Sequence, residues 1–408
     1  MKLQPFQKDK LADFLDRALL YSLYGLVLFI PVSISAIEIL FIIALAIFIV
    51  KKALKPDFGF LKAPHHIFLL LFFAFTGLSI FNSGLYLQKS LDALLFKWLE
   101  WILIFVMAGD ALSSPSRVRG SVNILLSVSI LIVIDGLAQR FLGVEFLLGR
   151  EMVWINQGFY GMTASFQHYN SLGTYLSFVL LLVLGALVFG RLKRSYKAGL
   201  VFLAALLGAC LLLTFSRGSW LGFLAGLSVM LALSPHRRVI FMVAALSVVL
   251  LITLPIVKER AFFIFEEYGT SERLGLLEIC WRMIRENPFL GKGVGTFMDY
   301  CSIYTSGEVV KHAHNCYLQI AAETGIFALG SFLVFLGTVL YRSIKSLKKN
   351  FDYLLLGLVS AISGFLVQSF LDVQLYSLQL AALFWFFLGV MACVGRINDT
   401  TGNDAWKK

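Results

Sequence analysis

Two histidines stand directly before an apolar run in the stretch HAHNCYLQIAAETG, residues 312–325. Imidazole titrates near neutral pH, so a neutral histidine can take a proton from a hydroxyl group as its oxygen attacks a carbon atom. Arginine binds phosphate oxygens in a bidentate manner, and TFSRGSWL and TSERLGLL contain Arg217 and Arg273. These residue types favour attack by a hydroxyl on a carbon whose leaving group is a diphosphate.

The composition decides what must position these residues. Of the 408 residues, 59% are hydrophobic and only 14% are charged, and the mean hydropathy is +0.83. Soluble globular domains use far fewer apolar residues. The apolar runs are continuous and do not alternate with polar residues, so helices and not a β-barrel must span the bilayer. The sequence predicts an all-α integral membrane protein.

About twelve transmembrane helices are predicted from the apolar runs. We expect residues 1–408 to form a single polytopic membrane domain, with one long periplasmic loop at 257–313. Several runs are shorter than a free-standing span, so their ends must extend into flanking residues or be shielded by neighbours. The predicted spans are 18–34, 36–50, 67–81, 93–108, 122–138, 172–190, 200–214, 220–233, 239–256, 317–341, 353–371 and 378–394.

The distribution of basic residues orients these spans. Lysine and arginine concentrate in alternate loops, as in KKALK (51–55), RLKR (191–194) and RSIKSLKK (342–349). Under the positive-inside rule, these loops and both termini lie in the cytoplasm. The net charge of +11 is then explained by membrane topology and anionic lipid headgroups, and nucleic acid is not needed as a partner.

The long loop contains TSERLGLLEICWRMIRENPF (270–289). Leu274, Leu277, Trp281 and Ile284 recur at helical spacing, and a breaker, Asn287 and Pro288, follows. This pattern predicts an amphipathic helix that lies on the outer membrane surface or caps the bundle.

This topology sorts the polar residues by side of the membrane. His65, His66 and His236 fall on the cytoplasmic side, where we expect them in solvated loops. The candidate site residues fall on the periplasmic side, and they are His168, Arg217, Arg273, His312, His314, Asn315 and Asp372.

Arg217 contradicts the usual charge bias, because it lies in a short external turn. It follows Ser216 at a helix start, where backbone N–H groups also favour anions. Capping of the preceding helix, or contact with ordinary lipid phosphates, explains Arg217 about equally well. The case for Arg273 as a phosphate-binding residue is weaker, because surface amphipathic helices commonly carry arginine.

His314 is the candidate base, and Asn315 stands beside it. A lone histidine at the start of a span more often anchors the membrane interface. The arginines on the same side of the membrane favour catalysis here.

Other chemistries have little support in the sequence. No D-x-D pair occurs, and His312 and His314 have no nearby third ligand, so no metal site is expected. No P-loop or dinucleotide fingerprint occurs either, so no cofactor is expected and the energy must come from the substrate. Among the external cysteines Cys280, Cys301 and Cys316, a disulfide is not the favoured interpretation.

Four stretches together resemble the O-antigen ligase and polymerase superfamily. HNCYLQIAAETG resembles its signature of a His-Asn pair followed by a glycine at the head of a span, and TFSRGSWL resembles its second signature. The segments 271–297 and ASFQHYNSLGTYL (164–176) are similar to its long-loop segment and to the start of its next span, where Asn170 matches. The resemblance runs from about residue 165 to the last span.

The resemblance implies a metal-independent, inverting transfer at the periplasmic face of the bacterial inner membrane. The donor would be a glycan linked to undecaprenyl diphosphate, and the acceptor would be a sugar of the lipid A core. By position, His314 would be the base, and Arg217 and Arg273 would hold the diphosphate. We expect His168, His312, Asn315 and Asp372 to help bind the substrate, and the sequence does not assign an individual role to each.

Other functions remain open. Ligases often carry a second glycine where this chain has Ala328, so an O-antigen polymerase or protein oligosaccharyltransferase of the same superfamily is an alternative. A flippase or transporter of lipid-linked glycans would also suit twelve spans, and the charges at Glu38, Lys97, Glu100 and Asp135 would be natural in it. Against transport, the charged clusters line one face and do not trace a path through the midplane.

Overall fold

The computed structural model of the chain describes residues 5–156, 159–189, 192–235, 237–253, 267–305 and 312–401. Helices dominate this part of the chain, as the sequence predicts. The departure is one two-stranded antiparallel hairpin, β1 (Val153–Asn156) and β2 (Phe159–Gly161), in the segment that leads to α7. These strands are too short for a periodic signal, so the sequence did not reveal them.

The first half of the chain forms long helices joined by short turns. A π-helical segment, η4, lies within the continuous helical stretch that runs from α4 to α5. The elements are α1 (Pro5–Phe29), α2 (Ile34–Leu54), η1 (Gly59–Lys62), α3 (His65–Ser79), η2 (Ile80–Asn82), η3 (Gly84–Tyr86), α4 (Leu87–Ala93), η4 (Leu94–Trp98), α5 (Leu99–Ala111) and α6 (Pro115–Leu142).

The second half contains the candidate site residues. Its elements are α7 (Tyr169–Phe189), α8 (Arg194–Leu213), α9 (Arg217–Leu233), α10 (Arg237–Thr253), α12 (Glu267–Glu286), α13 (Phe297–Tyr304), α14 (Cys316–Lys349), α15 (Tyr353–Gln368), η6 (Gln374–Tyr376) and α16 (Leu378–Thr401).

Each predicted span falls on a helical stretch. Seven of the described helical stretches are long and apolar enough to cross a membrane, and α9, α15 and part of α10 are shorter apolar helices. The chain is therefore a multi-pass membrane protein. The count of twelve spans, the single domain and the periplasmic placement of 257–313 stay predictions.

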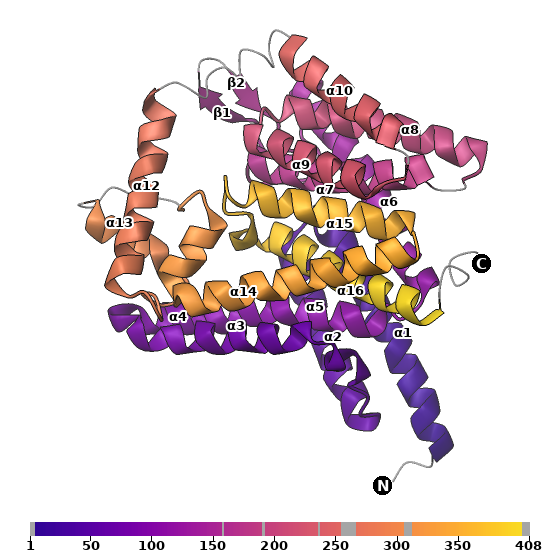
Figure 1. Cartoon of the computed structure of the whole chain (residues 1–408), viewed down its shortest axis with the longest axis horizontal. Coiled ribbons are helices and arrows are strands. Elements are labelled where there is room, and N and C mark those ends of the chain that lie inside the picture. The colour runs from indigo at the N-terminus through magenta and orange to yellow at the C-terminus, as the bar shows by residue number, and fades with distance from the viewer. Residues whose placement is uncertain are drawn as a thin grey trace.

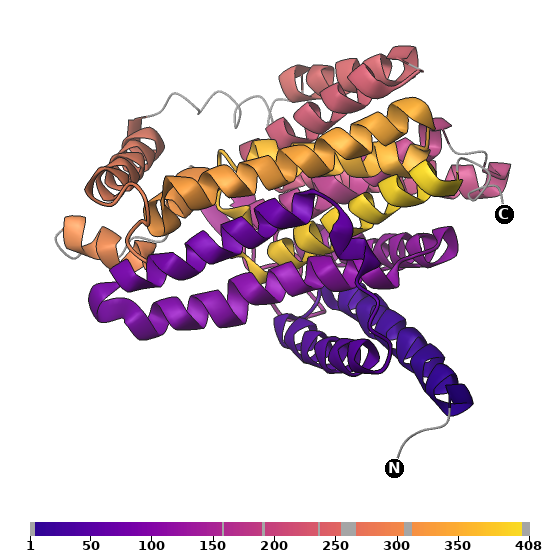
Figure 2. The ribbon, with the colours of Figure 1, turned by 60° about the horizontal axis from the view of Figure 1, so that its bottom comes forward.

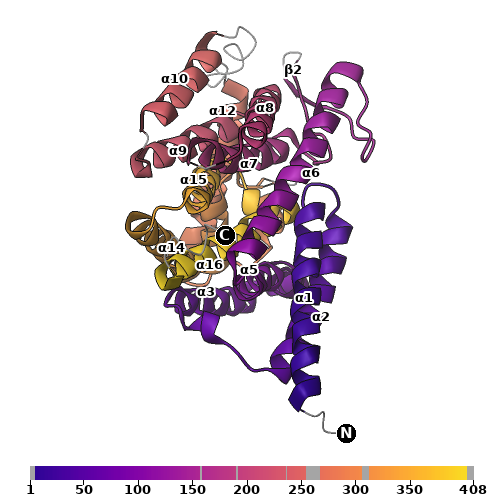
Figure 3. The ribbon, with the colours of Figure 1, turned by 90° about the vertical axis from the view of Figure 1, so that its right-hand side faces the viewer.

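The helices form an inner and an outer set. Within the most apolar windows, 89% of residues are buried for Leu378–Asn398 and 78% for Tyr169–Val188, against 22% for α2 and 28% for α8. Because lipid tails solvate apolar side chains, α2 and α8 can present them outward, whereas α16 and α7 are enclosed by protein. Figure 1 shows α16 behind α14 and α15 at the centre, and Figure 3 shows α1 and α2 side by side along one flank.

Small residues allow the central helices to approach closely. Gly222 of α9 and Gly364 of α15 face each other, and a Cβ atom built on Gly364 would lie 2.5 Å from the carbonyl oxygen of Gly222. Gly173 of α7 packs equally tightly on Ser219 of α9. Such contacts are typical of membrane helix interfaces, and here they fix the starts of α7 and α9 beside the end of α15.

A break at Gly325 docks the long loop onto α14. Gly325 has φ 83° and ψ 171°, and a Cβ atom there would lie 2.1 Å from the carbonyl oxygen of Phe289. Gly291 meets the backbone of Glu323 in the same way. Only glycine tolerates both this conformation and this close approach. The buried Glu323 carboxylate accepts hydrogen bonds from the N–H groups of Gly295 and Phe297 at 2.9 and 3.3 Å.

The predicted amphipathic helix exists as α12, at the end of the bundle where α14 begins (Figure 2). Of the four apolar residues that predicted it, Ile284 packs on α14. The face packed on α14 contains Leu276, Cys280, Met283 and Ile284, whereas Leu274 and Trp281 are 60% and 52% exposed. Both faces carry apolar residues, so periodicity alone could not select the buried one.

The prediction that His65 and His66 lie in solvated loops is wrong. They occupy the first turn of α3 and are 6% and 8% exposed. The basic residues nearby in sequence suggested a loop, but α3 begins at His65, two residues before the predicted span. His236 lies outside the described residues.

Candidate active site

His314 lies immediately before the start of α14, in a left-handed backbone conformation with φ 50°. The next residue, Asn315, is the N-cap, and its Oδ1 atom accepts a hydrogen bond from the N–H of Leu318 at 3.0 Å. The side chain of Asn315 is therefore used to begin the helix. That of His314 is 34% exposed and available to a substrate.

Asp372 lies next to His314, in the turn between α15 and α16. Its Oδ1 atom is 3.4 Å from the Nδ1 atom of His314, which is an ion-pair distance without hydrogen-bond geometry. The N–H of Val373 donates to the same oxygen at 2.8 Å, and the N–H of Cys316 donates to the carbonyl of Ser369. The start of α14 and the end of α15 are thus joined around this pair.

The charge state of Asp372 follows from its neighbours. Burial alone raises the pKa of its carboxyl group, but the His314 imidazole, the N–H of Val373 and the charge of His168 outweigh burial and hold the pKa below 3.8. Asp372 is therefore ionised at neutral pH.

Asn170, in the first turn of α7, extends this contact toward α9. Its Nδ2 atom donates to Oδ2 of Asp372 at 2.8 Å, and its Oδ1 atom accepts from the hydroxyl of Ser216 at 2.7 Å. His168 stands just before α7, and its Nδ1 atom accepts the N–H of Asn170 at 3.2 Å. His314, Asp372, Asn170 and Ser216 form a continuous polar relay, the name used for them below.

Arg217 is the first residue of α9, directly after the relay. Ser216 is the N-cap, and its hydroxyl accepts the N–H of Ser219 at 3.4 Å. A Cβ atom on the next residue, Gly218, would lie 3.7 Å from the side chain of Leu371, the neighbour of Asp372. Arg217 and His314 therefore lie at the same end of the bundle.

Buried polar residues next to the relay hydrogen-bond the helices that carry it. The Nε2 atom of Gln368, near the end of α15, donates to the hydroxyls of Thr174 and Ser219 at 2.7 and 2.9 Å. Both helices that supply these hydroxyls also carry relay residues. Since buried polar groups are costly when unpaired, this network restricts how α7, α9 and α15 can sit against one another.

Backbone strain concentrates in the segments that lead into the site. Among the described residues other than glycine, positive φ occurs at Ala164, Phe215 and His314. Phe215 and His314 each stand just before a helix N-cap at the site, and Ala164 precedes His168 and α7. Such conformations cost free energy and persist where surrounding structure enforces them, commonly at functional sites.

Three helix N-termini therefore meet here, those of α7, α9 and α14. Helix N-termini carry partial positive charge and unpaired N–H groups, which attract anions. With Arg217 on one side and a carboxylate-paired imidazole on the other, the arrangement suits proton abstraction beside a phosphate group.

His312 has a different environment from His314. Its Nδ1 atom lies 3.4 Å from Nε2 of Gln319, and its ring centroid is 5.9 Å from that of Tyr376. Burial lowers the pKa of His312, the charge of Asp372 partly opposes this, and His314 and Lys97 reinforce it. His312 is therefore neutral at physiological pH and packs against the turn that holds Asp372.

Arg273 does not join the relay within the described residues. It is exposed in the second turn of α12, and no hydrogen bond or ion pair links it to His314 or Asp372 in the part of the chain described. The clamp of two arginines stays a prediction.

Sequence reasoning missed several residues that the structure brings to the site. Ser216 and Gln368 carry the polar contacts described above, and the guanidinium of Arg140 at the end of α6 lies 5.8 Å from the ring centroid of Phe215. For Arg140 a signal existed, because it is another arginine at a helix end that the charge pattern assigns to the external side. For Gln368 there was none.

The cysteine, histidine and acidic side chains of the described residues were compared with the arrangements that hold metals and disulfides. No group of three or more His, Cys, Asp or Glu side chains there is arranged to hold a metal ion. All five cysteines are free and buried.

Sequence comparison relates part of the second half of the chain to a known protein family. No curated protein matches the sequence. Residues 201–333 match the O-antigen ligase family, a stretch that includes Arg217, Arg273 and His314. This stretch is thus similar to the O-antigen ligase domain family, whose members are membrane enzymes that transfer lipid-linked glycans by ligation or polymerisation.

Proposed function

We propose that the chain is an O-antigen ligase, which moves a glycan from undecaprenyl diphosphate onto a sugar hydroxyl of the lipid A core. The polar relay is the observation that carries this proposal. It connects the candidate base His314 to the N-terminus of α9 and Arg217 through Asp372 and Asn170.

His314 acts as the general base in this proposal. Its Nδ1 atom faces Asp372 at 3.4 Å, which leaves Nε2 to accept the proton of the acceptor hydroxyl. Asp372 orients the ring and stabilises the imidazolium that forms. A carboxylate behind a histidine has this effect in other enzymes that use a histidine base.

Arg217 holds the leaving group. As the acceptor oxygen bonds to the anomeric carbon, the bond from that carbon to the phosphate oxygen breaks, and its electron pair goes to undecaprenyl diphosphate. The Arg217 guanidinium and the N-terminus of α9 stabilise the negative charge that develops there. Attack from the face opposite the leaving group inverts the anomeric carbon.

The positive-inside pattern supports a location in the bacterial inner membrane with both termini in the cytoplasm. The site would then face the periplasm, at the depth of the carrier's headgroup, and the segment 257–313 would be a periplasmic loop of a single polytopic domain formed by residues 1–408. Asn315 and His312 would shape the site without touching the reacting atoms. Arg273 would approach the diphosphate only when substrate is bound.

The acceptor separates the ligase from its alternatives. The full chain is purified, reconstituted in vesicles and given an undecaprenyl-diphosphate-linked glycan together with lipid A core, a second carrier-linked glycan or an unfolded protein. Transfer to lipid A core supports the ligase. Elongation on the carrier would make the chain a polymerase, modification of the protein would make it an oligosaccharyltransferase, and movement of the donor without transfer would make it a flippase.

A further inference from the structure

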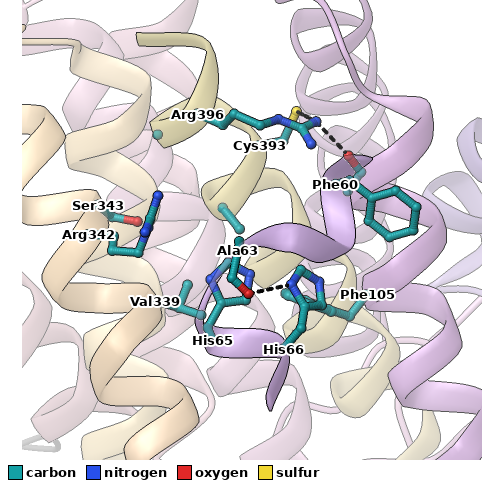
Figure 4. A pocket seen from close by; sticks show the side chains of 13 residues that line it. Phe60, Ala63, His65, His66, Phe105, Val339, Arg342, Ser343, Cys393 and Arg396 are labelled. Atoms are coloured by element: carbon teal, nitrogen blue, oxygen red, sulfur yellow. Dashed lines mark hydrogen bonds between the residues drawn. The ribbon is translucent and has the colours of Figure 1, made fainter. Parts of the chain in front are cut away.

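A small cavity lies at the end of the bundle opposite His314. It is enclosed by η1, α3, α5, α14 and α16 and has a volume of about 60 Å³. Figure 4 shows its polar lining, with His65 and His66 on one side, Arg342 and Ser343 of α14 on another, and Arg396 of α16 above them.

The length of α14 separates this cavity from the candidate active site. Cys316, the first residue of α14, lies two positions after His314. Arg342 lies 26 positions after Cys316 on the same helix, which corresponds to roughly 39 Å at 1.5 Å per residue, less the effect of the break at Gly325. The hydrocarbon core of a bilayer is about 30 Å thick. The cavity therefore lies at the other membrane surface, and the relay is not part of it.

The lining of the cavity carries positive charge without a counter-charge. Two arginines and two histidines line it, together with Ser343, Cys393 and apolar residues, and none of the lining residues is acidic. The guanidinium of Arg396 donates to the carbonyl of Gly109 at 2.9 Å, which fixes it at the wall. Arg342 is exposed on α14, so its side chain is accessible from the surface. Such a site selects for an anion.

The side chain of His65 has a buried nitrogen atom without a hydrogen-bond partner among the described residues. Its side chain is 6% exposed, and its buried Nδ1 atom has no hydrogen-bond partner in the described part of the chain. The ring is held by contacts, with its centroid 4.3 Å from that of His66 and 6.0 Å from that of Phe105. His66 differs, because its Nδ1 atom lies 3.2 Å from the carbonyl of Ala63, a contact drawn in Figure 4. A buried nitrogen without a partner is rare in native proteins and is usually matched by a ligand or water.

We propose that this cavity binds a phosphate group. The cavity is small, about 60 Å³, and its basic lining suits a compact anion such as one phosphate group. Guanidinium groups bind phosphate oxygens bidentately, and His65 supplies a further nitrogen. The bound group would connect α3, α14 and α16 at this surface of the membrane.

Two sources could supply this chemistry at a cytoplasmic surface, a phosphate monoester lipid headgroup or free phosphate. Purified full-length protein is examined by native mass spectrometry with phosphatidic acid and, separately, with phosphatidylcholine. Thermal unfolding is measured in inorganic phosphate and in chloride at equal ionic strength. We expect retention of phosphatidic acid over phosphatidylcholine if a headgroup is bound, and a higher midpoint in phosphate if the free ion is bound.

A pair of matched variants tests whether the phosphate group binds in the cavity or elsewhere on the surface. Arg342→Gln removes a cation from the cavity, whereas Lys345→Gln removes one from the same helix at an exposed position outside the lining. Losing one charge-assisted contact lowers affinity about tenfold, so Arg342→Gln reduces binding by that factor and Lys345→Gln leaves it unchanged. His65→Phe keeps an aromatic ring in place and also reduces binding.

Two results would overturn the proposal. One is that neither phosphatidic acid nor inorganic phosphate binds the wild-type protein more strongly than its control. The other is that Arg342→Gln and Lys345→Gln weaken binding equally, because general surface charge would then explain it.

Discussion

The two imidazoles of the HAH stretch differ in environment although one residue separates them. His314 is 34% exposed and faces the Asp372 carboxylate, whereas His312 packs against Gln319 and Tyr376. The sequence marked both as candidates and favoured His314 because of its position beside Asn315. It could not show that Asp372 is its partner, because 58 positions separate the two residues and only the packing of α14 on α15 brings them together.

The environment of His312 gives a prediction for stability against pH. Because folding lowers its pKa below 6.5, the unfolded chain takes up this proton more readily than the folded chain. Its contribution therefore destabilises the fold progressively as pH falls below about 6.5. His312→Gln removes that contribution, so thermal midpoints measured from pH 7.5 to pH 5 should fall less steeply in the variant than in the wild type. Parallel curves would show that His312 is not buried in its neutral form.

Arg217 and Arg273 form a matched pair of arginines. Lysine keeps the charge but cannot reproduce the planar, bidentate guanidinium. Because Arg217 adjoins the relay and Arg273 is exposed on α12, Arg217→Lys should lower the transfer rate about tenfold or more, and Arg273→Lys should lower it less. Initial rates of glycan transfer by the two reconstituted variants measure this. Equal losses would support the clamp of two arginines that the sequence suggests.

At the level of elements, the sequence predicted the helices well and their packing poorly. Each predicted apolar run falls on a helical stretch, and Ser216, Asn315 and Asp352 are N-caps of the residue types expected at helix starts. The residues of α12 that pack on α14 could not be selected from the sequence, because apolar residues lie on both of its faces. Periodicity records which faces are apolar, and only contacts with α14 decide which one is buried.

Gly325 and Gly330 lie five residues apart in α14, and their surroundings differ. Gly325 has φ 83° and touches the backbone of Phe289, whereas a Cβ atom on Gly330 would meet nothing within 4 Å. Gly325→Ala should therefore destabilise the fold by about 1–3 kcal/mol, and Gly330→Ala should be neutral or stabilise it by up to about 1 kcal/mol. Unfolding in mixed micelles measures both. Equal effects would mean that α14 is continuous at Gly325.

For the whole molecule, charge and chemistry divide between the two ends of the bundle. The relay lies at one end, with the turn of η3 and the loop around Gly291, and basic residues such as Lys348 and Lys349 close α14 at the other. The positive-inside pattern assigned these ends to the periplasm and the cytoplasm from sequence alone. The cavity around His65 was not foreseen, since its lining comes from segments that lie hundreds of residues apart.

Introduced cysteines test this orientation. The five native cysteines are buried, so a membrane-impermeant maleimide should react only with added ones. Leu85, which is 99% exposed, lies at the relay end, and the exposed Lys348 lies at the other. In intact cells stripped of their outer membrane, Leu85→Cys should be labelled and Lys348→Cys should react only after lysis. The reverse pattern would place the relay in the cytoplasm.

The central claim is that His314 accepts the proton of the acceptor hydroxyl, and a single-turnover assay tests it most directly. Wild-type protein and His314→Ala are loaded with the same undecaprenyl-diphosphate-linked glycan, donor binding is measured, and acceptor is added in excess. We predict unchanged donor binding and transfer slowed by about 10²–10⁴-fold, the usual contribution of a general base. Transfer at close to the wild-type rate by His314→Ala would contradict the account.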